Sequence, residues 1–295
     1  MSRSRWEKNL FDLIRRTSTD LPTEVESAIR RALKKEKKGS NAWWALDAML
    51  RNAAAARKTD APICQDTGAL LFYCIVPVGF DTNALVAMTR AAVSKATRLG
   101  YLRQNTIDSV SGAAYATNVA PASPVFHFQQ GARKTVDIRL VMKGGGSENV
   151  GAQYSLPDED LGADRTMEGV RRCILDAVWQ AQGKGCSPGV LGVCIGGDRA
   201  TGYAHSKEQF LRKLGERSPV KSLAKLEARI MSDAARLGIG PMGLGGKTAL
   251  LGVKIDALSR LPASFFVTVS YMCWAFRRRG VLLGPEGGVN KWLYG

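Results

Sequence analysis

Six cysteines are the residues of this chain best suited to chemistry, and their local sequences divide five of them into two groups and leave Cys194 intermediate. Cys74 and Cys173 stand inside apolar runs, where buried structural thiols are expected, and Cys194 has apolar neighbours but adjoins a Gly-Gly turn. The other three stand in loops or directly after an apolar strand, where a thiol can be presented to a site: Cys64, Cys186 and Cys273. No CxxC pair is present, so spacing alone indicates no metal site.

Glycine-rich segments form a second set of candidates. The segment Gly238–Thr248 lacks the P-loop pattern, because Pro241 stands six residues before Lys247, where that motif requires glycine. The segment Lys143–Asn149 (KGGGSEN) has no dinucleotide fingerprint either. Consecutive glycines at a strand end can still direct backbone N–H groups at an anion, a carboxylate as well as a phosphate. The alternative is that these segments only form tight turns.

The elements that must position these residues are of mixed type. Residues 1–57 are expected to be helical, with Thr23 and Glu26 as a capping box. Beyond them, apolar runs predict strands and amphipathic stretches predict helices, so we expect a mixed α/β (α+β) fold with a helical N-terminal region followed by mixed sheets covered by helices. The expected divisions are a helical region at 1–57, the main domain at 58–280 and a loose C-terminal tail at 281–295.

Composition limits the class of protein. The chain has 295 residues, is 45% hydrophobic and carries a net charge of +16, which suggests an anionic partner. Nucleic acid is the less favoured partner because no DNA- or RNA-recognition motif is present. The longest apolar stretch, Ala69–Val78, is about half the length that spans a bilayer. With no secretory signal, we expect a cytoplasmic protein with reduced thiols and no membrane association.

Four motifs and a final cysteine occur in an order that resembles one family. They are PICQDTG (Pro62–Gly68), KGGGSEN, the GCSP loop, GPMGLGGKTALLGVKI (Gly240–Ile255) and Cys273 in CWAFRRR. Together, over about residues 20–280, they resemble the α subunit, or N-terminal domain, of the class I fumarate hydratases and L-tartrate dehydratases. The resemblance implies a hydro-lyase that hydrates or dehydrates a small dicarboxylate. It also implies a [4Fe–4S] cluster held by Cys64, Cys186 and Cys273, whose open iron acts as a Lewis acid.

The resemblance also implies roles for residues near the cysteines. Gln65 and Asp66 would lie at the active site as catalytic and substrate-binding residues, with Asp66 a candidate for proton transfer; the alternative is that Asp66 caps its own glycine turn. Arg103 would pair with a substrate carboxylate. The remaining implied substrate contacts are the Gly144, Gly145 and Gly146 amides and Lys247.

Some features depart from the family pattern. Leu261 stands twelve residues before Cys273, where the family usually has a histidine near the substrate, and GCSPG replaces the common Cys-Pro-Pro. The two histidines, His127 and His205, are interpreted as structural or exposed. About fifteen residues follow the arginine run, so the resemblance implies a separate β subunit in an αβ heteromer. The alternative function is a catalytically diverged cluster-binding or regulatory subunit of the same fold.

Overall fold

The computed structural model describes residues 3–295, and the chain divides into two compact units. Unit 1 combines the segment ending at Thr23 with Arg51–Gly145 and Ala275–Gly295. Unit 2 combines Glu24–Leu50 with Gly146–Trp274. Each unit has its own sheet and its own hydrophobic core, and the predicted mixed α+β class is confirmed.

The N-terminal region is helical, as expected. Helix α1 buries one stripe, which includes Trp6, Leu10 and Leu13 at helical spacing, in the core of unit 1. Helix α2 begins at Thr23 and carries acidic residues in its first turn and lysines in its last, which suits the helix dipole. The bounds of the three helices are α1 Arg3–Thr19, α2 Thr23–Lys35 and α3 Asn41–Thr59.

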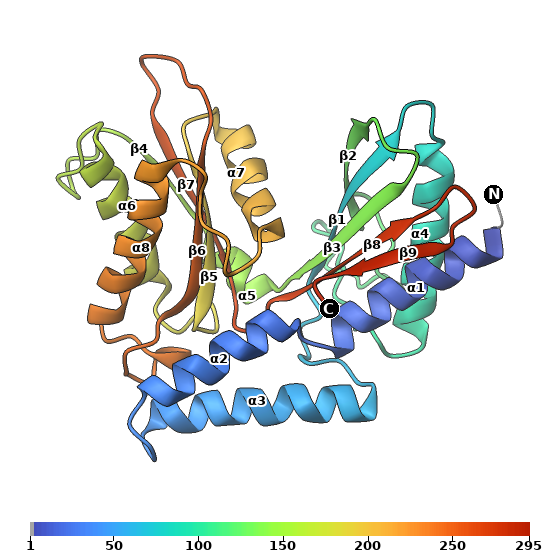
Figure 1. Cartoon of the computed structure of the whole chain (residues 1–295), viewed down its shortest axis with the longest axis horizontal. Coiled ribbons are helices and arrows are strands. Elements are labelled where there is room, and N and C mark those ends of the chain that lie inside the picture. Colours follow the sequence, from blue (N-terminus) through green and yellow to red (C-terminus); the bar gives the residue numbers. More distant parts are fainter. Residues whose placement is uncertain (1–2) are drawn as a thin grey trace. The chain divides into compact units, whose positions relative to one another are not determined.

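Unit 1 contains a five-stranded sheet in the order β2-β1-β3-β8-β9 (Figure 1). The β1–β2 pair is parallel and the other pairs are antiparallel. Helices α1 and α4 pack on one face, where Phe72 and Ile138 join their apolar stripes. The bounds are β1 Ala69–Pro77, α4 Thr82–Arg98, β2 Val125–Gly131, β3 Val136–Lys143, β8 Arg277–Leu283 and β9 Val289–Leu293.

The prediction of a loose C-terminal tail at 281–295 is wrong. Strand β8 continues through Leu283 and pairs with β3, and β9 returns along β8 as the edge of the sheet. Gly287, at φ +78°, forms the turn between them and lies against Trp6. The cationic run Arg277–Arg279 concealed the strand, because its three side chains are buried although their type suggests a surface.

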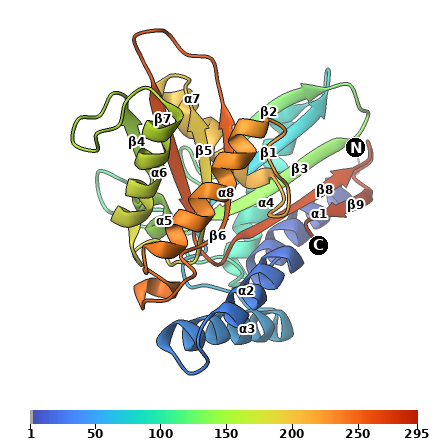
Figure 2. The same cartoon turned by 60° about the vertical axis from the view of Figure 1, so that its left-hand side comes forward.

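Unit 2 contains a four-stranded sheet in the order β4-β7-β5-β6, with β5 and β6 parallel (Figures 1 and 2). Helices α6 and α8 cover one face and α7 covers the other, so β5 is buried on both sides. Gly192 allows this close packing, since a Cβ there would lie 2.1 Å from the Ser206 carbonyl oxygen. The bounds are β4 Ala152–Ser155, α6 Met167–Ala181, β5 Gly189–Ile195, α7 Arg199–Glu208, α8 Lys221–Arg236, β6 Leu250–Ala257 and β7 Phe266–Met272.

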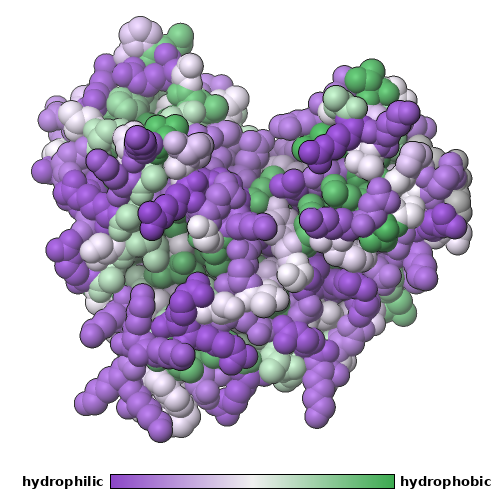
Figure 3. Space-filling model, viewed as in Figure 1, coloured by the Kyte–Doolittle hydropathy of each residue, from purple (hydrophilic) through white to green (hydrophobic). Residues whose placement is uncertain are grey.

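Hydrophilic side chains cover most of the face shown in Figure 3. Among residues 3–295, no helix has the length and apolar character that crossing a membrane requires.

Candidate functional site

The first cysteine motif lies at one end of the unit 1 sheet. The loop Cys64–Gly68 leads directly into β1, whose first residue, Ala69, pairs with Lys143 at the end of β3. Gly68 has φ +79°, and a Cβ there would lie 2.6 Å from the carbonyl carbon and oxygen of Lys143. Glycine is therefore required at this position, and the cysteine loop and the glycine-rich segment pack directly against each other.

Asp66 is held by the glycine-rich segment. Its Oδ2 accepts a hydrogen bond from the Gly145 amide at 2.7 Å, and a Cβ on Gly144 would lie 2.8 Å from that oxygen. The Asp66 carboxylate therefore binds the first residue of a short helix, α5 (Gly145–Asn149), which stands where a turn was expected, and the Gly68 amide of its own turn donates to Asn105 instead. The Gly145 amide does point at a carboxylate, but that carboxylate belongs to Asp66.

A set of polar residues ties Arg103 to the same loop. The Arg103 amide donates to Thr67 Oγ1 at 3.2 Å. Asn105, with its amide oxygen toward the loop, accepts from Thr67 Oγ1 and Thr67 N at 3.0 Å and from Gly68 N at 3.1 Å. Asn118 Nδ2 in turn donates to the Arg103 carbonyl at 2.6 Å. These contacts fix the Arg103 backbone beside the loop, and its exposed guanidinium has no hydrogen bond or ion pair within residues 3–295.

Sequence reasoning did not identify Thr67, Asn105 and Asn118 as part of this site. Thr67 lies inside the PICQDTG motif, so its position was a usable signal. Asn105 and Asn118 lie in an irregular segment between α4 and β2, and no periodicity relates them to the loop. Only the folded chain shows that they support it.

The other two candidate cysteines lie together in unit 2, at one end of its sheet. Cys186 precedes β5 and Cys273 follows β7, and these antiparallel neighbours pair Val190 with Met272. The start of one strand therefore lies beside the end of the other. The amide of Trp274 donates to the Cys186 carbonyl at 3.1 Å, which joins the two loops directly.

The GPMGLGG loop lies at the same end of unit 2, because it precedes β6, which runs parallel to β5. Ser187 Oγ donates to the Gly240 carbonyl at 2.8 Å, and the Met242 amide donates to the Ser187 carbonyl at 2.8 Å. A Cβ on Gly183 would lie 2.4 Å from the Met242 carbonyl oxygen. Cys186, with φ +56°, is thus held in the left-handed region between tightly packed loops.

Tyr271 fills the space beside Cys186. Its ring is 2% exposed, and a Cβ on Gly185 or Gly189 would lie within 2.7 Å of ring atoms. Burial raises the pKa of Tyr271, and nearby negative charge on Cys273 and Cys186 raises it further. The ring therefore contacts both sides of the second cysteine loop and lies close to both thiols.

Lys247 is exposed, and its backbone is fixed by Glu36. The Lys247 amide donates to Glu36 Oε1 at 2.9 Å and to Oε2 at 3.2 Å, and Thr248 Oγ1 donates to Oε1 at 2.8 Å. A shallow pocket lined by Glu36, Lys37, Ser40–Ala42 and Leu244–Lys247 adjoins this contact. Glu36 follows α2 and was not identified from the sequence.

Five of the six thiols have the exposure that their sequence contexts predicted, and Cys194, whose context was intermediate, is buried. None forms a disulfide, and Cys64, Cys186 and Cys273 are the three with intermediate exposure. The others are buried, and burial raises the pKa of each to about 12: Cys74, Cys173 and Cys194. The loop cysteines are therefore the accessible sulfur donors, and the buried three are inert at neutral pH.

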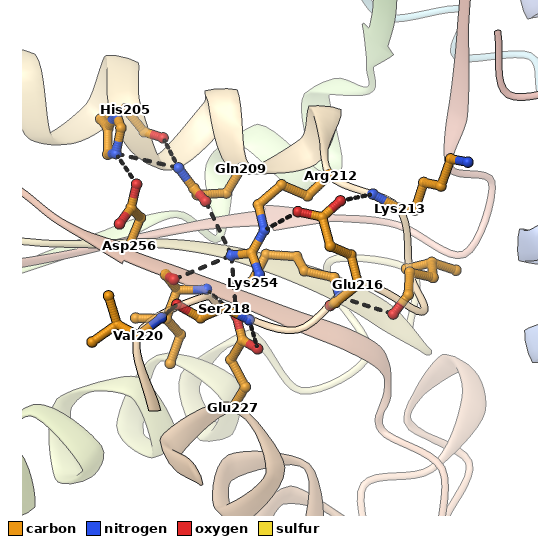
Figure 4. Close-up of polar contacts among 12 residues, drawn as sticks. His205, Gln209, Arg212, Lys213, Glu216, Ser218, Val220, Glu227, Lys254 and Asp256 are labelled. Atoms are coloured by element: carbon orange, nitrogen blue, oxygen red, sulfur yellow. Dashed lines mark hydrogen bonds and ion pairs between the residues drawn. The ribbon is translucent and has the colours of Figure 1, made fainter. Parts of the chain in front are cut away.

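Both histidines have structural contacts. His127 lies in β2 and stacks on Tyr73, with ring centroids 4.6 Å apart. His205 lies in a polar cluster of unit 2 (Figure 4), where Nδ1 is 3.1 Å from Glu208 and Nε2 is 3.0 Å from Asp256. The cluster continues through Gln209 to Arg212 and the buried Glu227.

Leu261 lies away from Cys273. It is 74% exposed, in the loop before β7, whereas Cys273 follows the last residue of that strand. The seven-residue strand separates the two positions by roughly 20 Å.

The structure groups the predicted site residues by unit. Unit 1 holds Cys64, Gln65, Asp66, Arg103, Gly144 and Gly145, and unit 2 holds Gly146, Cys186, Lys247 and Cys273. Within residues 3–295, no three His, Cys, Asp or Glu side chains are grouped as a metal-ligand set.

Comparison with known proteins supplies the family. The family described as Fumarate hydratase (Fumerase) matches residues 7–281. A putative fumarate hydratase class I of Geobacillus stearothermophilus is 46% identical over 97% of this chain, which spans 57% of that relative's length. A putative L(+)-tartrate dehydratase subunit alpha of Methanocaldococcus jannaschii is 32% identical over 91% of this chain, and the match covers 94% of that relative's length. The L(+)-tartrate dehydratase subunit alpha of Escherichia coli is 30% identical over 90% of this chain, and the match covers 86% of that relative's length. The resemblance seen in the sequence motifs is confirmed, and the chain belongs to the fumarate hydratase family.

Proposed function

We propose that this chain is the α-type subunit of an iron–sulfur hydro-lyase that adds water to, or removes it from, a small dicarboxylate. The relatives named fumarate hydratase and L(+)-tartrate dehydratase support this reaction class. Fumarate and tartrate are both small dicarboxylates, and the net charge of +16 suits an anionic substrate.

The observation that carries the proposal is the division of the thiols. Cys64, Cys186 and Cys273 are the half-exposed cysteines, and all three lie on loops that follow or precede a strand at a sheet end. Thiolate sulfur is the donor that iron–sulfur clusters require, so this donor set fits a [4Fe–4S] cluster with one iron lacking a protein ligand. When bound, such a cluster supplies a Lewis acid for a substrate hydroxyl and carboxylate.

The protein's own groups supply the remaining chemistry. Asp66 stands two residues after Cys64, and the Gly145 amide fixes its Oδ2, so the other carboxylate oxygen can exchange a proton with the carbon next to the departing hydroxyl. Arg103 presents an exposed guanidinium beside the same loop for a substrate carboxylate. We assign substrate binding also to Gln65 and Lys247, which are exposed.

A β subunit is part of the proposal. The relatives from M. jannaschii and E. coli are named as alpha subunits, which implies a partner chain for those proteins. By analogy, this chain would form a complete active site together with a β-type chain, in the cytoplasm, where thiols stay reduced.

Anaerobic reconstitution with iron and sulfide tests the proposal. The expected content is about four irons per chain in the wild type. It is lost in Cys64→Ala, Cys186→Ala and Cys273→Ala and kept in the matched control Cys74→Ala. Addition of a β-type chain should then give fumarate or tartrate turnover. A wild-type chain that takes up no iron, or a Cys64→Ala variant that keeps it, contradicts the cluster assignment; full iron content without turnover of any dicarboxylate supports a diverged cluster-binding subunit instead.

A further inference from the structure

Arg277 is a buried cation without a partner. Its side chain is 1% exposed, and within residues 3–295 its guanidinium makes no hydrogen bond or ion pair. Two of its nitrogens, Nε and Nη1, are fully enclosed without an acceptor. Buried charges in proteins are nearly always paired, because leaving water without a counter-charge is costly.

Nearby and comparable buried cations are satisfied. Arg279, two residues along the same strand, pairs with the Asp20 carboxylate. Lys254 in unit 2 is 3% exposed, and its Nζ donates to the carbonyl oxygens of Leu214 and Glu216. Among residues 3–295, Arg277 differs from these cations because its guanidinium has no acceptor; Arg278 Nε also lacks one, but the Arg278 guanidinium stacks on Phe276 and Tyr294.

The sheet register places Arg277 at the cysteine end of unit 1. It opens β8 opposite Met142, which is itself opposite Leu70, the second residue of β1. Residues opposite each other in antiparallel strands point to the same face, so the Arg277 side chain lies on the face that carries Leu70 and Met142.

That face is the one covered by α1. The Ile63 amide donates to the Ser18 carbonyl at 3.0 Å, which ties the start of the Cys64 loop to the last turn of α1. Arg279 reaches Asp20, just beyond the same turn, from the same face of β8. Arg277 thus lies between the sheet and the end of α1, at the end of unit 1 where the Cys64 loop enters β1.

We infer that Arg277 is the counter-charge for the anionic group that Cys64 holds, and that its Nε and Nη1 donate to that group. The inference rests on the proposed function, in which Cys64 binds an iron–sulfur cluster through thiolate sulfur. Such a cluster with three thiolates carries net negative charge, and a buried guanidinium that donates to its sulfurs would slow its loss.

The experiment compares Arg277→Met, Arg277→Lys and wild type, each with and without reconstituted iron and sulfide. Two quantities are measured: the rate at which a chelator removes iron from the loaded protein, and the Tm of the iron-free protein. Lys254→Met is the matched control, because it also removes a buried cation but one with carbonyl partners in unit 2.

The expected result has two parts. Arg277→Met should lose iron about tenfold faster than wild type or more, because hydrogen bonds to charged groups are lost. Its iron-free form should have a higher Tm than wild type, since an unpaired buried charge has been replaced by an apolar side chain of similar length. The rate of iron loss from Arg277→Lys should lie between those of wild type and Arg277→Met. Lys254→Met should lower the Tm without changing the rate of iron loss.

Different failures identify different errors. Wild-type and Arg277→Met proteins that load iron and lose it at the same rate overturn the role of Arg277 and leave the cluster proposal intact. A lower Tm of the iron-free Arg277→Met protein, with iron loss unchanged in Arg277→Lys, shows that the partner is within the chain and also overturns the inference. A wild-type protein that binds no iron overturns the proposed function itself, and the role of Arg277 with it.

Discussion

Removal of the Glu36 carboxylate should release the loop that carries Lys247. Glu36 accepts hydrogen bonds from the Lys247 amide and from Thr248 Oγ1, at 2.9 and 2.8 Å to Oε1. A Cβ on Gly246 would lie 2.8 Å from Glu36 Oε2, so the loop backbone also packs against this carboxylate. Glu36→Ala removes both acceptor contacts at once.

The magnitude follows from these two bonds. A hydrogen bond to a charged group contributes about 1.5–3 kcal/mol when buried, and the Lys247 contact is exposed, so we expect about 2 kcal/mol for the pair. This free energy corresponds to roughly thirtyfold faster local opening. Glu36→Gln keeps one oxygen acceptor and should have an effect of only a few-fold.

Hydrogen–deuterium exchange of a peptide covering residues 240–250 measures this opening directly. The control is Glu159→Ala, since Glu159 is an exposed glutamate of the same unit. If Glu36→Ala leaves exchange in this peptide at the wild-type rate, Glu36 does not hold the loop and the reasoning fails. A uniform increase over all of unit 2 would likewise refute a local role.

Three further predictions concern the site, the thiols and the packing. Asp66→Asn should keep full iron content and lose turnover by about a hundredfold or more, because an amide cannot accept the proton; turnover close to wild type excludes Asp66 from proton transfer. Stability should fall as the pH rises above about 9, because the folded pKa of buried Cys74 is raised to about 12 from 9.0, so the unfolded thiol ionises first. Denaturation at pH 8 and 10 should show this loss reduced by about 1.4 kcal/mol in Cys74→Ala. Gly189→Ala should destabilise the protein by about 1–3 kcal/mol, because the new Cβ would lie 2.2 Å from Tyr271 Cζ, whereas Gly215→Ala, with no atom within 4 Å, should be near neutral in the same denaturation assay.

Local sequence patterns predicted the helices and strands in which the buried residues are apolar. Strand β1 is a continuous apolar run, and α1 carries its apolar residues at helical spacing. Strand β8 was missed because RRRGVLL opens with three arginines, and arginine usually marks a surface. Arg277 and Arg279 are buried on the face that α1 covers, whereas Arg278 stacks on Phe276 and Tyr294. This burial depends on contacts between residues more than 250 positions apart, such as Arg279 with Asp20.

The site was predictable to the extent that it depends on local context. Local context predicted the burial of five of the six thiols, but it left Cys194 open, because apolar neighbours and a Gly-Gly turn at a strand end point in opposite directions; the structure shows that Cys194 is buried. The partner of Asp66 was not predictable, because the Gly145 amide is 79 residues away and reaches it only through the pairing of β1 with β3. The family resemblance supplied Arg103, and the structure adds Thr67, which fixes its backbone.

Strand direction, more than distance along the chain, decides which motifs meet in unit 2. Cys186 precedes β5 and Cys273 follows its antiparallel neighbour β7, so residues 87 positions apart are joined by the Trp274–Cys186 hydrogen bond. Leu261 is only twelve positions from Cys273, but an extended strand lies between them and carries it to the opposite end of the sheet. Counting residues back from the third cysteine therefore does not identify a neighbour of that cysteine within unit 2. Within unit 2, Tyr271 and the glycine loops form the surroundings of Cys186 and Cys273, and Leu261 takes no part in them.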